Sequence, residues 1–229
     1  MIKEISVVLP VYNESEIIAK VLDEVLSFVR KRFDKYEIVV VDDGSIDNSG
    51  RIIKNLCQSN GHINLVTHEN NRGYGAAIRT GLKTACLDYI CFMDADAQFR
   101  IEDIDSLLPY IDDYHIVIGY REKRKDPLYR VFLGKIFTIF FNFYLNTHFR
   151  DINCGYKLFK RNCLKGMSLK LNGPLINTEI LIASKKMGLK IKECSVPHYP
   201  RASGQQTGAK ISTIFKAFKD FFCMLFKIH

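Results

Sequence analysis

The stretch Ile38 to Ser49 reads IVVVDDGSIDNS, and it decides the fold class of this 229-residue chain. Its first four residues are β-branched with no polar interruption, which is typical of a strand buried on both faces of a parallel sheet. Its remainder is rich in aspartate, serine and glycine, the residues that form turns. The pattern therefore predicts a buried strand that ends in an acidic turn.

Working outward, short apolar runs alternate with segments of helical spacing. The predicted strands are Ile5–Leu9, Glu37–Val41, Asn64–Thr67, Asp88–Met93, Ile116–Gly119 and Ile191–His198. Helices are predicted after Asn13, around Ile52 to Leu56, over Gly73 to Ala85 and over Asn177 to Met187, with Asn13 and Glu16 spaced as a capping box at the first of them. Strands that alternate with helices indicate the α/β class, with a Rossmann-like, doubly wound and mostly parallel sheet.

Acidic clusters follow two of these strands. Asp42 and Asp43 come directly after the second strand, and the sequence Asp94-Ala95-Asp96 comes after the fourth. Ligands of such sheets bind beyond the carboxyl ends of the strands. We therefore expect both clusters to lie at one ligand-binding edge.

The pair Asp94 and Asp96 is a candidate metal site. Side chains two residues apart in an extended segment point the same way, so both carboxylates can reach one ion, and the side-chain oxygen of Gln98 could join them. Mg²⁺ and Mn²⁺ prefer oxygen ligands and often combine one or two carboxylates with phosphate oxygens. The alternative for such a short pattern is a solvated turn.

Other residues near this edge are candidates for nucleotide binding. Asp42 and Asp43 could accept hydrogen bonds from a ribose or a base, or they could form a turn with Ser45. Further residues at alternate positions after the first strand face the same crevice, unless they serve only as a turn and a helix start; they are Pro10, Tyr12 and Glu14.

Composition narrows the class of protein. The formal net charge is +8, and the seven cysteines are scattered without a C-x-x-C pair. The cysteine pattern argues against a disulfide framework or a zinc site and fits a reducing cytosol. The basic excess serves solubility or favours an anionic partner, such as a phosphorylated ligand or a membrane surface. We expect no nucleic-acid partner, because no recognised nucleic-acid-binding motif is present.

Two aromatic-rich segments point to a membrane surface. Residues 129–145 are apolar and aromatic, and residues 209–229 have the pattern of an amphipathic basic helix that lies in the membrane plane. No run of eighteen apolar residues and no signal peptide is present, so we expect a peripheral protein on the cytoplasmic face of a membrane. The predicted division is a domain over 1–208 followed by the helix 209–229. Pairing of these helices between copies of the chain, giving a homo-oligomer, is the alternative to lipid contact.

Four stretches, in this order, resemble the family-2 inverting glycosyltransferases of GT-A fold: VVLPVYNES from Val7, IVVVDDGSIDNS from Ile38, NRGYGAAIRTG from Asn71 and FMDADAQF from Phe92. The later stretches DINCGYKLFKR from Asp151 and HYPRASGQQTGA from His198 are similar to the dolichol-phosphate mannose synthase and polyprenyl-phosphate glycosyltransferase branch. The resemblance implies transfer of a hexose, with inversion, from a UDP- or GDP-linked sugar to a polyprenyl or dolichyl phosphate.

The resemblance also implies roles for individual residues. The nucleoside would be held by Pro10, Tyr12, Glu14 and Asp43, in a donor pocket lined by Arg72, Gly73 and Gly75. The Mg²⁺ or Mn²⁺ ion and the donor diphosphate would be held by Asp94, Asp96 and Gln98. Phosphates would be contacted by Arg121, Arg130 and Arg201. Glu179 falls near a position where the family often has an acid. It would orient the sugar or the acceptor, or it is simply an acid favoured in the first turn of a helix.

Departures from the branch pattern keep the sugar open. Lys157 stands where arginine is common, and the chain has Gly204-Gln205-Gln206-Thr207 in place of the GxSK-like segment of mannose synthases. Glucose or another hexose therefore fits as well as mannose. Two further alternatives are a family-2 transferase with a hydroxyl acceptor, which would need a strong general base, and a non-catalytic scaffold attached to the membrane.

Overall fold

The computed structural model describes residues 2–122, 124–125 and 128–201; the side chains of Leu128, Arg130 and Leu145 are also outside the description. The strands are β1 (Glu4–Val11), β2 (Lys35–Asp42), β3 (Ile63–Thr67), β4 (Tyr89–Met93), β5 (Ile116–Arg121), β6 (Tyr156–Lys160) and β7 (Ile191–Val196). The α-helices are α1 (Ile18–Arg32), α2 (Ser49–Ser59), α3 (Tyr74–Thr84), α4 (Leu128–Leu145) and α5 (Ile176–Lys186), and the 3₁₀ helices are η1 (Ile101–Ser106), η2 (Leu108–Tyr110) and η3 (Arg161–Leu164).

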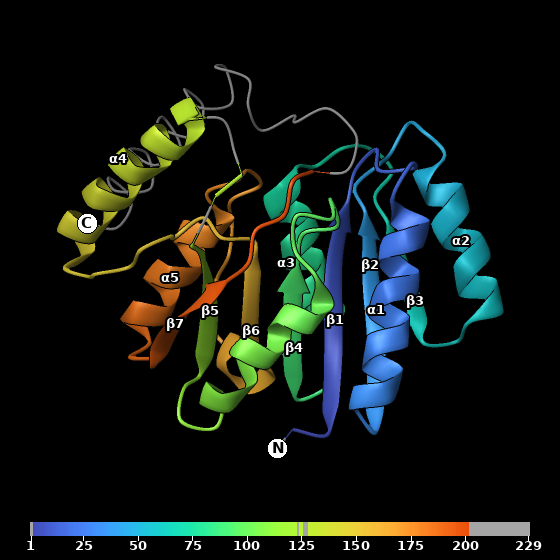
Figure 1. The fold of residues 1–229 in the computed structure, drawn as a ribbon, viewed down its shortest axis with the longest axis horizontal. Helices are drawn as coiled ribbons and strands as arrows, with labels where there is room; N and C mark the ends of the chain where they lie inside the picture. Colours follow the sequence, from blue (N-terminus) through green and yellow to red (C-terminus); the bar gives the residue numbers. More distant parts are fainter. Residues whose placement is uncertain (1, 123, 126–127, 202–229) are drawn as a thin grey trace.

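All seven described strands form one sheet in the order β3-β2-β1-β4-β6-β5-β7. The pairs β1/β2, β1/β4, β2/β3 and β5/β7 are parallel, whereas β6 runs antiparallel to both β4 and β5. The prediction of an α/β fold with a mostly parallel sheet is confirmed. In Figure 1 the parallel strands run upward from the N-terminus, so their carboxyl ends lie at the upper edge.

Alternate residues of the central strands fill two hydrophobic cores, one on each face of the sheet. Val7 and Leu9 of β1 belong to the core that also contains the buried faces of α1 and η1. Val8 belongs to the opposite core, with residues of α3 and α5. This period of two along a fully buried strand is the reason why the β-branched run in β2 carries no polar residue. The result is a sheet with helices on both faces, which leaves its edges for ligands.

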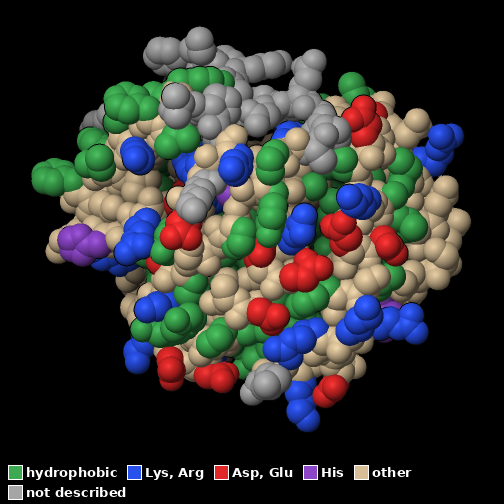
Figure 2. Space-filling model, in the orientation of Figure 1, with side chains coloured by type: hydrophobic (Ala, Val, Ile, Leu, Met, Phe, Trp, Pro, Cys, Tyr) green, Lys and Arg blue, Asp and Glu red, His purple; other side chains and the backbone are tan. Residues whose placement is uncertain are grey.

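Helix α4 differs from the others because much of its apolar surface is exposed. Phe137 and Phe141 are buried and belong to the core shared with α3 and α5. In contrast, Phe132, Ile139 and Phe143 are 64%, 69% and 87% exposed. Figure 2 shows a group of hydrophobic side chains over this helix, at the upper left. Among the described residues, no helix has both the length and the hydropathy needed to cross a membrane.

One strand was missed, one local prediction was wrong, and one prediction lies outside the described residues. Strand β6 was not predicted as part of the sheet from the hydropathy pattern. The capping box is wrong: Asn13 has a φ of 57°, its side chain accepts a hydrogen bond from the Ile46 amide at 2.9 Å, and α1 begins only at Ile18. The predicted helix 209–229, and with it the boundary of the predicted domain at 208, falls on residues outside the described ranges.

Candidate functional site

Asp94, at the end of β4, is held from two sides. The Tyr74 hydroxyl donates to its Oδ1 at 2.6 Å, and its own amide donates to the Gly155 carbonyl at 3.1 Å. A Cβ atom at position 155 would lie only 1.9 Å from Asp94 Oδ2. The space that the carboxylate occupies therefore exists because residue 155 is glycine.

Glu14 and Asp96 lie at the same edge, as the sequence predicted, and Arg201 joins them there. The Arg201 guanidinium lies 3.4 Å from Asp96 Oδ2 and also bonds to Glu14 Oε1. Asp96 Oδ1 accepts the Gln98 amide at 3.1 Å, while the Gln98 side chain lies 3.5 Å from the Tyr199 carbonyl. Residues that follow β1, β4 and β7 thus converge, and an arginine already serves as a cation for two of the carboxylates.

The acidic groups at this edge have raised pKa values. Burial raises the pKa of Glu14 to about 7; Arg201 opposes this shift, and the nearby Asp96 adds to it. Burial and then repulsion by Asp96 raise the pKa of Asp94, although hydrogen bonding from Tyr74 and the charges of Lys157 and Arg121 act in the opposite direction. The nearby cations therefore do not fully compensate the negative charge that these carboxyl groups would carry when ionised.

The residues fit a divalent cation. Asp94 and Asp96 supply carboxylate oxygens, and the buried Glu14 Oε2 has no hydrogen-bond partner. Within the described ranges, no three His, Cys, Asp or Glu side chains gather as a metal cluster. An ion held here would accordingly complete its coordination with water and diphosphate oxygens, which is how Mg²⁺ is usually bound in proteins that handle phosphates.

We predict that Mn²⁺ affinity rises between pH 6 and pH 8, by about tenfold per unit for each proton displaced. The reason is that the raised pKa of Glu14, about 7, and that of Asp94 keep protons on groups that must ionise at a metal site. The stability of the metal-free protein changes in the opposite direction. Carboxyl groups with raised pKa values bind protons more tightly in the folded state, so the free energy of unfolding falls as pH rises from about 4 towards 7. Calorimetric titration in buffers of different ionisation enthalpy would count the protons. Affinity that is flat with pH would contradict the prediction.

Asp43 organises the loop that precedes α3. Its carboxylate is buried and accepts the Arg72 and Gly73 amides at 3.0 and 2.8 Å, and His68 Nδ1 lies 2.6 Å from Oδ1. Gly73 has a φ of 100°, and a Cβ there would lie 2.4 Å from the Asn172 carbonyl oxygen. Oδ2 receives only one of these bonds, so it keeps the capacity to accept a hydrogen bond from a ligand.

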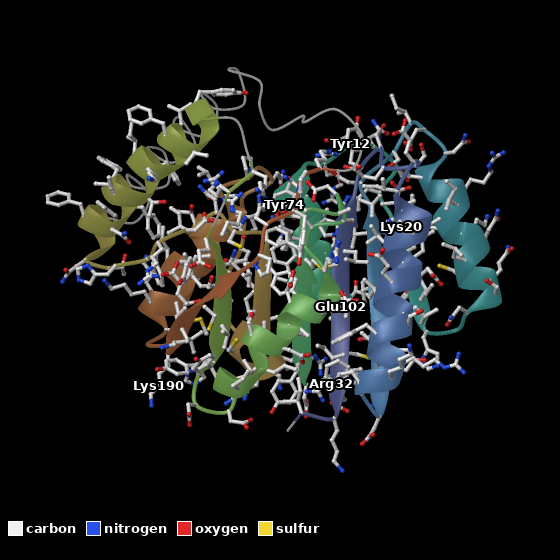
Figure 3. The ribbon with its side chains drawn as sticks, in the orientation of Figure 1. Tyr12, Lys20, Arg32, Tyr74, Glu102 and Lys190 are labelled. Atoms are coloured by element: carbon white, nitrogen blue, oxygen red, sulfur yellow. The ribbon has the colours of Figure 1, made fainter. Side chains whose placement is uncertain are left out.

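The other predicted nucleotide-binding residues lie around this loop. Asp42 Oδ1 accepts the Ser45 amide at 3.0 Å, so the turn anticipated for Asp42 is present. Pro10 is buried in β1, and Tyr12 is half-buried just beyond it. Figure 3 shows Tyr12 and Tyr74 at the upper edge, where the parallel strands end. Gly75 donates its amide to the Asn172 carbonyl at 2.7 Å, which packs the start of α3 against the segment before α5.

Glu179 supports that same segment. It lies in the first turn of α5, and its two carboxylate oxygens accept the Lys170 and Leu171 amides at 2.8 and 2.9 Å. The contact agrees with the alternative of a first-turn acid. A role for Glu179 in orienting sugar or acceptor stays a prediction, and this carboxylate is already occupied by backbone donors.

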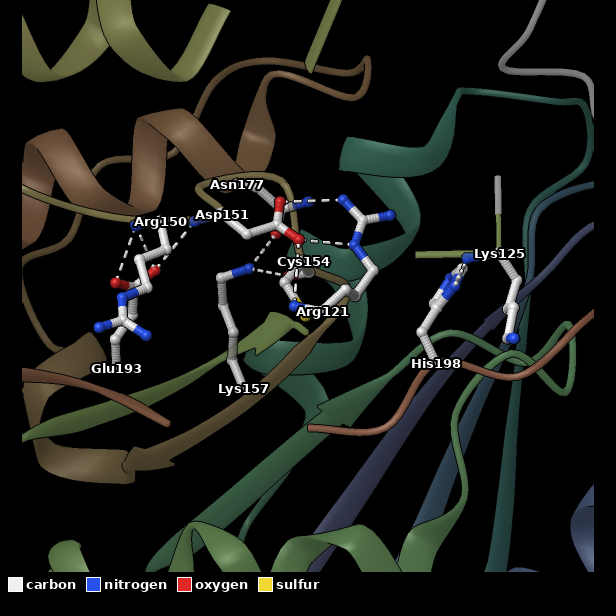
Figure 4. A network of polar contacts seen from close by, with 9 residues as sticks. All are labelled: Arg121, Lys125, Arg150, Asp151, Cys154, Lys157, Asn177, Glu193 and His198. Atoms are coloured by element: carbon white, nitrogen blue, oxygen red, sulfur yellow. Dashed lines mark hydrogen bonds and ion pairs between the residues drawn. The ribbon is translucent and has the colours of Figure 1, made fainter. Parts of the chain in front are cut away.

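Arg121, at the end of β5, is paired with a residue that sequence reasoning did not single out. Its Nε and Nη2 donate to the two carboxylate oxygens of Asp151 at 2.6 and 2.9 Å. Burial would raise the pKa of Asp151, but the Arg121 charge and hydrogen bonds outweigh it and hold that pKa below its usual range. Glu193 accepts the Asp151 amide at 3.0 Å, as Figure 4 shows. The phosphate contact predicted for Arg121 is not tested, and Arg130, in α4, has a side chain outside the description.

Several residues that shape the site were missed as individuals. Tyr74, Asp151 and Gly155 lie inside stretches that the sequence analysis quoted, so for them the available signal was membership of a motif. His68 lies outside every quoted stretch and had no such signal. Lys157 is fully buried in β6, and Asn177, in α5, accepts a hydrogen bond from it at 2.7 Å. A buried lysine cannot be recognised from hydropathy.

Comparison with known proteins places this geometry in context. The sequence model described as Glycosyl transferase family 2 matches residues 6–167. A dolichyl-phosphate beta-glucosyltransferase of Trichomonas vaginalis is 33% identical, over 84% of this chain and 64% of its own length. The human protein of the same name is 31% identical, over 85% and 67%. An undecaprenyl-phosphate 4-deoxy-4-formamido-L-arabinose transferase of Pectobacterium atrosepticum is 31% identical, over 89% and 62%.

The chain thus spans about two thirds of the length of these curated relatives. Among solved structures, glucosyl-3-phosphoglycerate synthase of Mycobacterium tuberculosis, in complex with Mn²⁺, uridine diphosphate and glucosyl-3-phosphoglycerate, matches with a TM-score of 0.69 and 19% identity. That match covers 88% of this chain and 73% of the synthase chain. At this identity the likeness shows the fold, and it confirms the GT-A fold expected from the sequence.

Proposed function

This chain belongs to glycosyl transferase family 2, and on that premise we propose that it transfers a hexose from a UDP- or GDP-linked sugar to a polyprenyl phosphate. The observation that carries the proposal is the meeting of Glu14, Asp94, Asp96 and Arg201 at the carboxyl edge of the sheet. Relatives named for transfer to dolichyl or undecaprenyl phosphate support the acceptor class.

On the donor side, Asp94 and Asp96 would hold Mg²⁺ or Mn²⁺. When bound, such an ion supplies Lewis-acid stabilisation of the charge on the leaving diphosphate. Solved relatives of the same fold contain Mn²⁺ with uridine diphosphate, which supports this assignment. The nucleoside would lie near Tyr12 and Asp43, where Asp43 keeps the Arg72–Gly73 loop in place.

On the acceptor side, a phosphate monoester is largely ionised near neutral pH and needs little help from a general base. A hydroxyl acceptor would need a strong one. Glu179, the candidate for such a base, is bound by two backbone amides, and this favours the phosphate acceptor. Arg121, whose planar guanidinium suits phosphate oxygens, would align the acceptor against the repulsion between two anions.

The test is a transfer assay with polyprenyl phosphate, Mn²⁺ and a panel of UDP- and GDP-hexoses. We expect radiolabelled sugar to reach the lipid from one donor. Product on a soluble hydroxyl acceptor, with none on the lipid, would overturn the proposed acceptor. Binding of Mn²⁺ and nucleotide without transfer to any acceptor would point to a scaffold on this fold.

The proposed partner also includes a membrane surface, on the cytoplasmic face, with the protein bound peripherally. The exposed apolar side chains of α4 support it, because a monomeric soluble protein rarely leaves such a continuous apolar patch in water. Aromatic side chains on one face of a helix suit the boundary between headgroups and acyl chains.

We expect the triple substitution of Phe132, Ile139 and Phe143 by serine to weaken binding to anionic liposomes by about tenfold or more, because each side chain contributes roughly 1.5–3 kcal/mol when fully buried in an apolar phase. Thermal stability should hold, since these side chains are mostly exposed. Phe141→Ser is the matched control: Phe141 is fully buried, so that change should lower the unfolding temperature. Unchanged liposome sedimentation of the triple variant, together with loss of a dimer, would favour pairing between copies.

A further inference from the structure

A line of polar side chains runs behind Asp94 from the interior of the protein. Lys157 Nζ donates to Asn177 Oδ1 at 2.7 Å and also to the Cys154 carbonyl. Burial raises the pKa of the Tyr74 hydroxyl, and the neighbouring Asn177 side chain acts in the opposite direction. The Tyr74 hydroxyl in turn donates to Asp94 Oδ1 at 2.6 Å. Lys157 is 0% exposed and Asn177 is 2% exposed, so bulk water does not compete for these bonds.

The line has a fixed direction because lysine can only donate. With Nζ donating to Asn177 Oδ1, the amide group of Asn177 is left to donate to the Tyr74 oxygen. The single hydroxyl proton of Tyr74 is then available for Asp94. The sense of every bond is therefore set by a charged residue that touches neither the nucleotide edge nor solvent.

Each member comes from a different element, and the sheet brings them together. Lys157 pairs across strands with Phe92 in the antiparallel β4/β6 ladder, and its ammonium lies 5.8 Å from the Phe92 ring centroid. Tyr74 begins α3, and Asn177 is in the first turn of α5. Burying a lysine costs several kcal/mol unless it is well hydrogen-bonded, so an ordinary core would place an apolar residue here.

We propose that Lys157, Asn177 and Tyr74 form a positioning relay that fixes the orientation of the Asp94 carboxylate for its divalent cation. The inference rests on the proposed function, since it assumes that Asp94 is a metal ligand. The relay acts through Asp94, so its members are positioning residues. Oδ1 is held by Tyr74, and the gap at Gly155 accommodates Oδ2, which together fix the carboxylate rotamer.

The first experiment measures Mn²⁺ binding to the full chain by electron paramagnetic resonance, with and without uridine diphosphate. We expect Tyr74→Phe to weaken Mn²⁺ binding by about 10- to 100-fold, the usual effect of removing a group that orients a metal ligand. Tyr156→Phe is the matched control: Tyr156 is buried on the same strand as Lys157, and its hydroxyl donates to the Ile101 carbonyl at 3.1 Å. The Tyr156→Phe variant loses a comparable hydrogen bond outside the relay, so it should bind Mn²⁺ with wild-type affinity.

A second experiment tests the direction of the relay. Asn177→Asp keeps the size of the side chain but offers Tyr74 an acceptor, which competes with Asp94 for the hydroxyl proton. We expect a loss similar to that of Tyr74→Phe, and the double variant Tyr74→Phe/Asn177→Asp should be no worse than the worse single variant. A purely structural role predicts losses of stability that add, with Mn²⁺ affinity unchanged.

Wild-type Mn²⁺ affinity in Tyr74→Phe, or an equal loss in Tyr156→Phe, would overturn the relay. So would a wild-type chain that binds no Mn²⁺, with or without uridine diphosphate. Failure of the proposed function is distinguishable, because the readout needs no acceptor: a chain that shows the expected Mn²⁺ losses but transfers no sugar to polyprenyl phosphate keeps the relay and loses the proposed acceptor.

Discussion

Asp96→Ala should lower sugar transfer by at least about 100-fold, the scale seen when one preorganised charge-stabilising group is removed from an active site. Asp96 would bind the cation, and it also holds Arg201 at 3.4 Å. Substitution removes both functions at once. The measurement is the initial rate of transfer at saturating donor, together with the affinity for Mn²⁺.

The same substitution should leave the metal-free protein as stable as before or more so. Asp96 raises the pKa of Asp94 and of Glu14, which means that it repels both carboxylates. Removing it relieves that repulsion. Asp105→Ala is a suitable control, because Asp105 is exposed and forms a 3.4 Å surface ion pair with Arg32. Transfer by Asp96→Ala at half the wild-type rate or better would refute the metal assignment.

Gly155→Ala should reduce transfer by on the order of 100-fold through a single added methyl group. That methyl carbon would lie 1.9 Å from Asp94 Oδ2 and 2.4 Å from Asp94 Cγ. One of the two must move, and the Tyr74 hydroxyl bond resists rotation of the carboxylate. We also expect the free energy of unfolding to fall by about 1–3 kcal/mol from the overpacking.

Two matched glycines separate this effect from the general cost of replacing glycine. A Cβ at Gly61 or at Gly173 would meet nothing within 4 Å. Gly61→Ala and Gly173→Ala should therefore transfer sugar at the wild-type rate. A Gly155→Ala protein that binds Mn²⁺ and transfers sugar normally would show that Asp94 does not need its present position.

The strands and the acidic edge of the sheet were predictable because they depend on local patterns. The β-branched run of β2 can satisfy its backbone only inside a sheet, and its aspartates must then lie at the ligand edge. Tyr156–Lys160 had no such pattern, because alternation of aromatic and basic residues does not reveal that Lys157 is fully buried. Lys157 can be buried because its ammonium donates to Asn177 and to the Cys154 carbonyl, and only the folded chain brings these groups near it.

The same reasoning explains the partners that were missed. Nothing in the sequence near Arg121 indicates that its partner is Asp151, thirty residues away. Asn13 was expected to cap α1 because the spacing to Glu16 matched, but the amide of Ile46 competes for its side chain across the loops. The position of a residue at the edge of the sheet was predictable from the local sequence pattern. The hydrogen-bond partner that a distant loop supplies to it was not.

The bridge from Arg201 to Glu14 has a consequence for folding order. It joins residues 187 positions apart, and the contact with Asp96 spans 105. Contacts of such separation carry a large loop-closure cost and form late, after local structure is in place. A ribosome-bound chain would hold a nearly complete sheet before its acidic edge received this arginine. The edge would then carry uncompensated negative charge until residue 201 had been added and had folded onto it, and free divalent cations could occupy it during that interval.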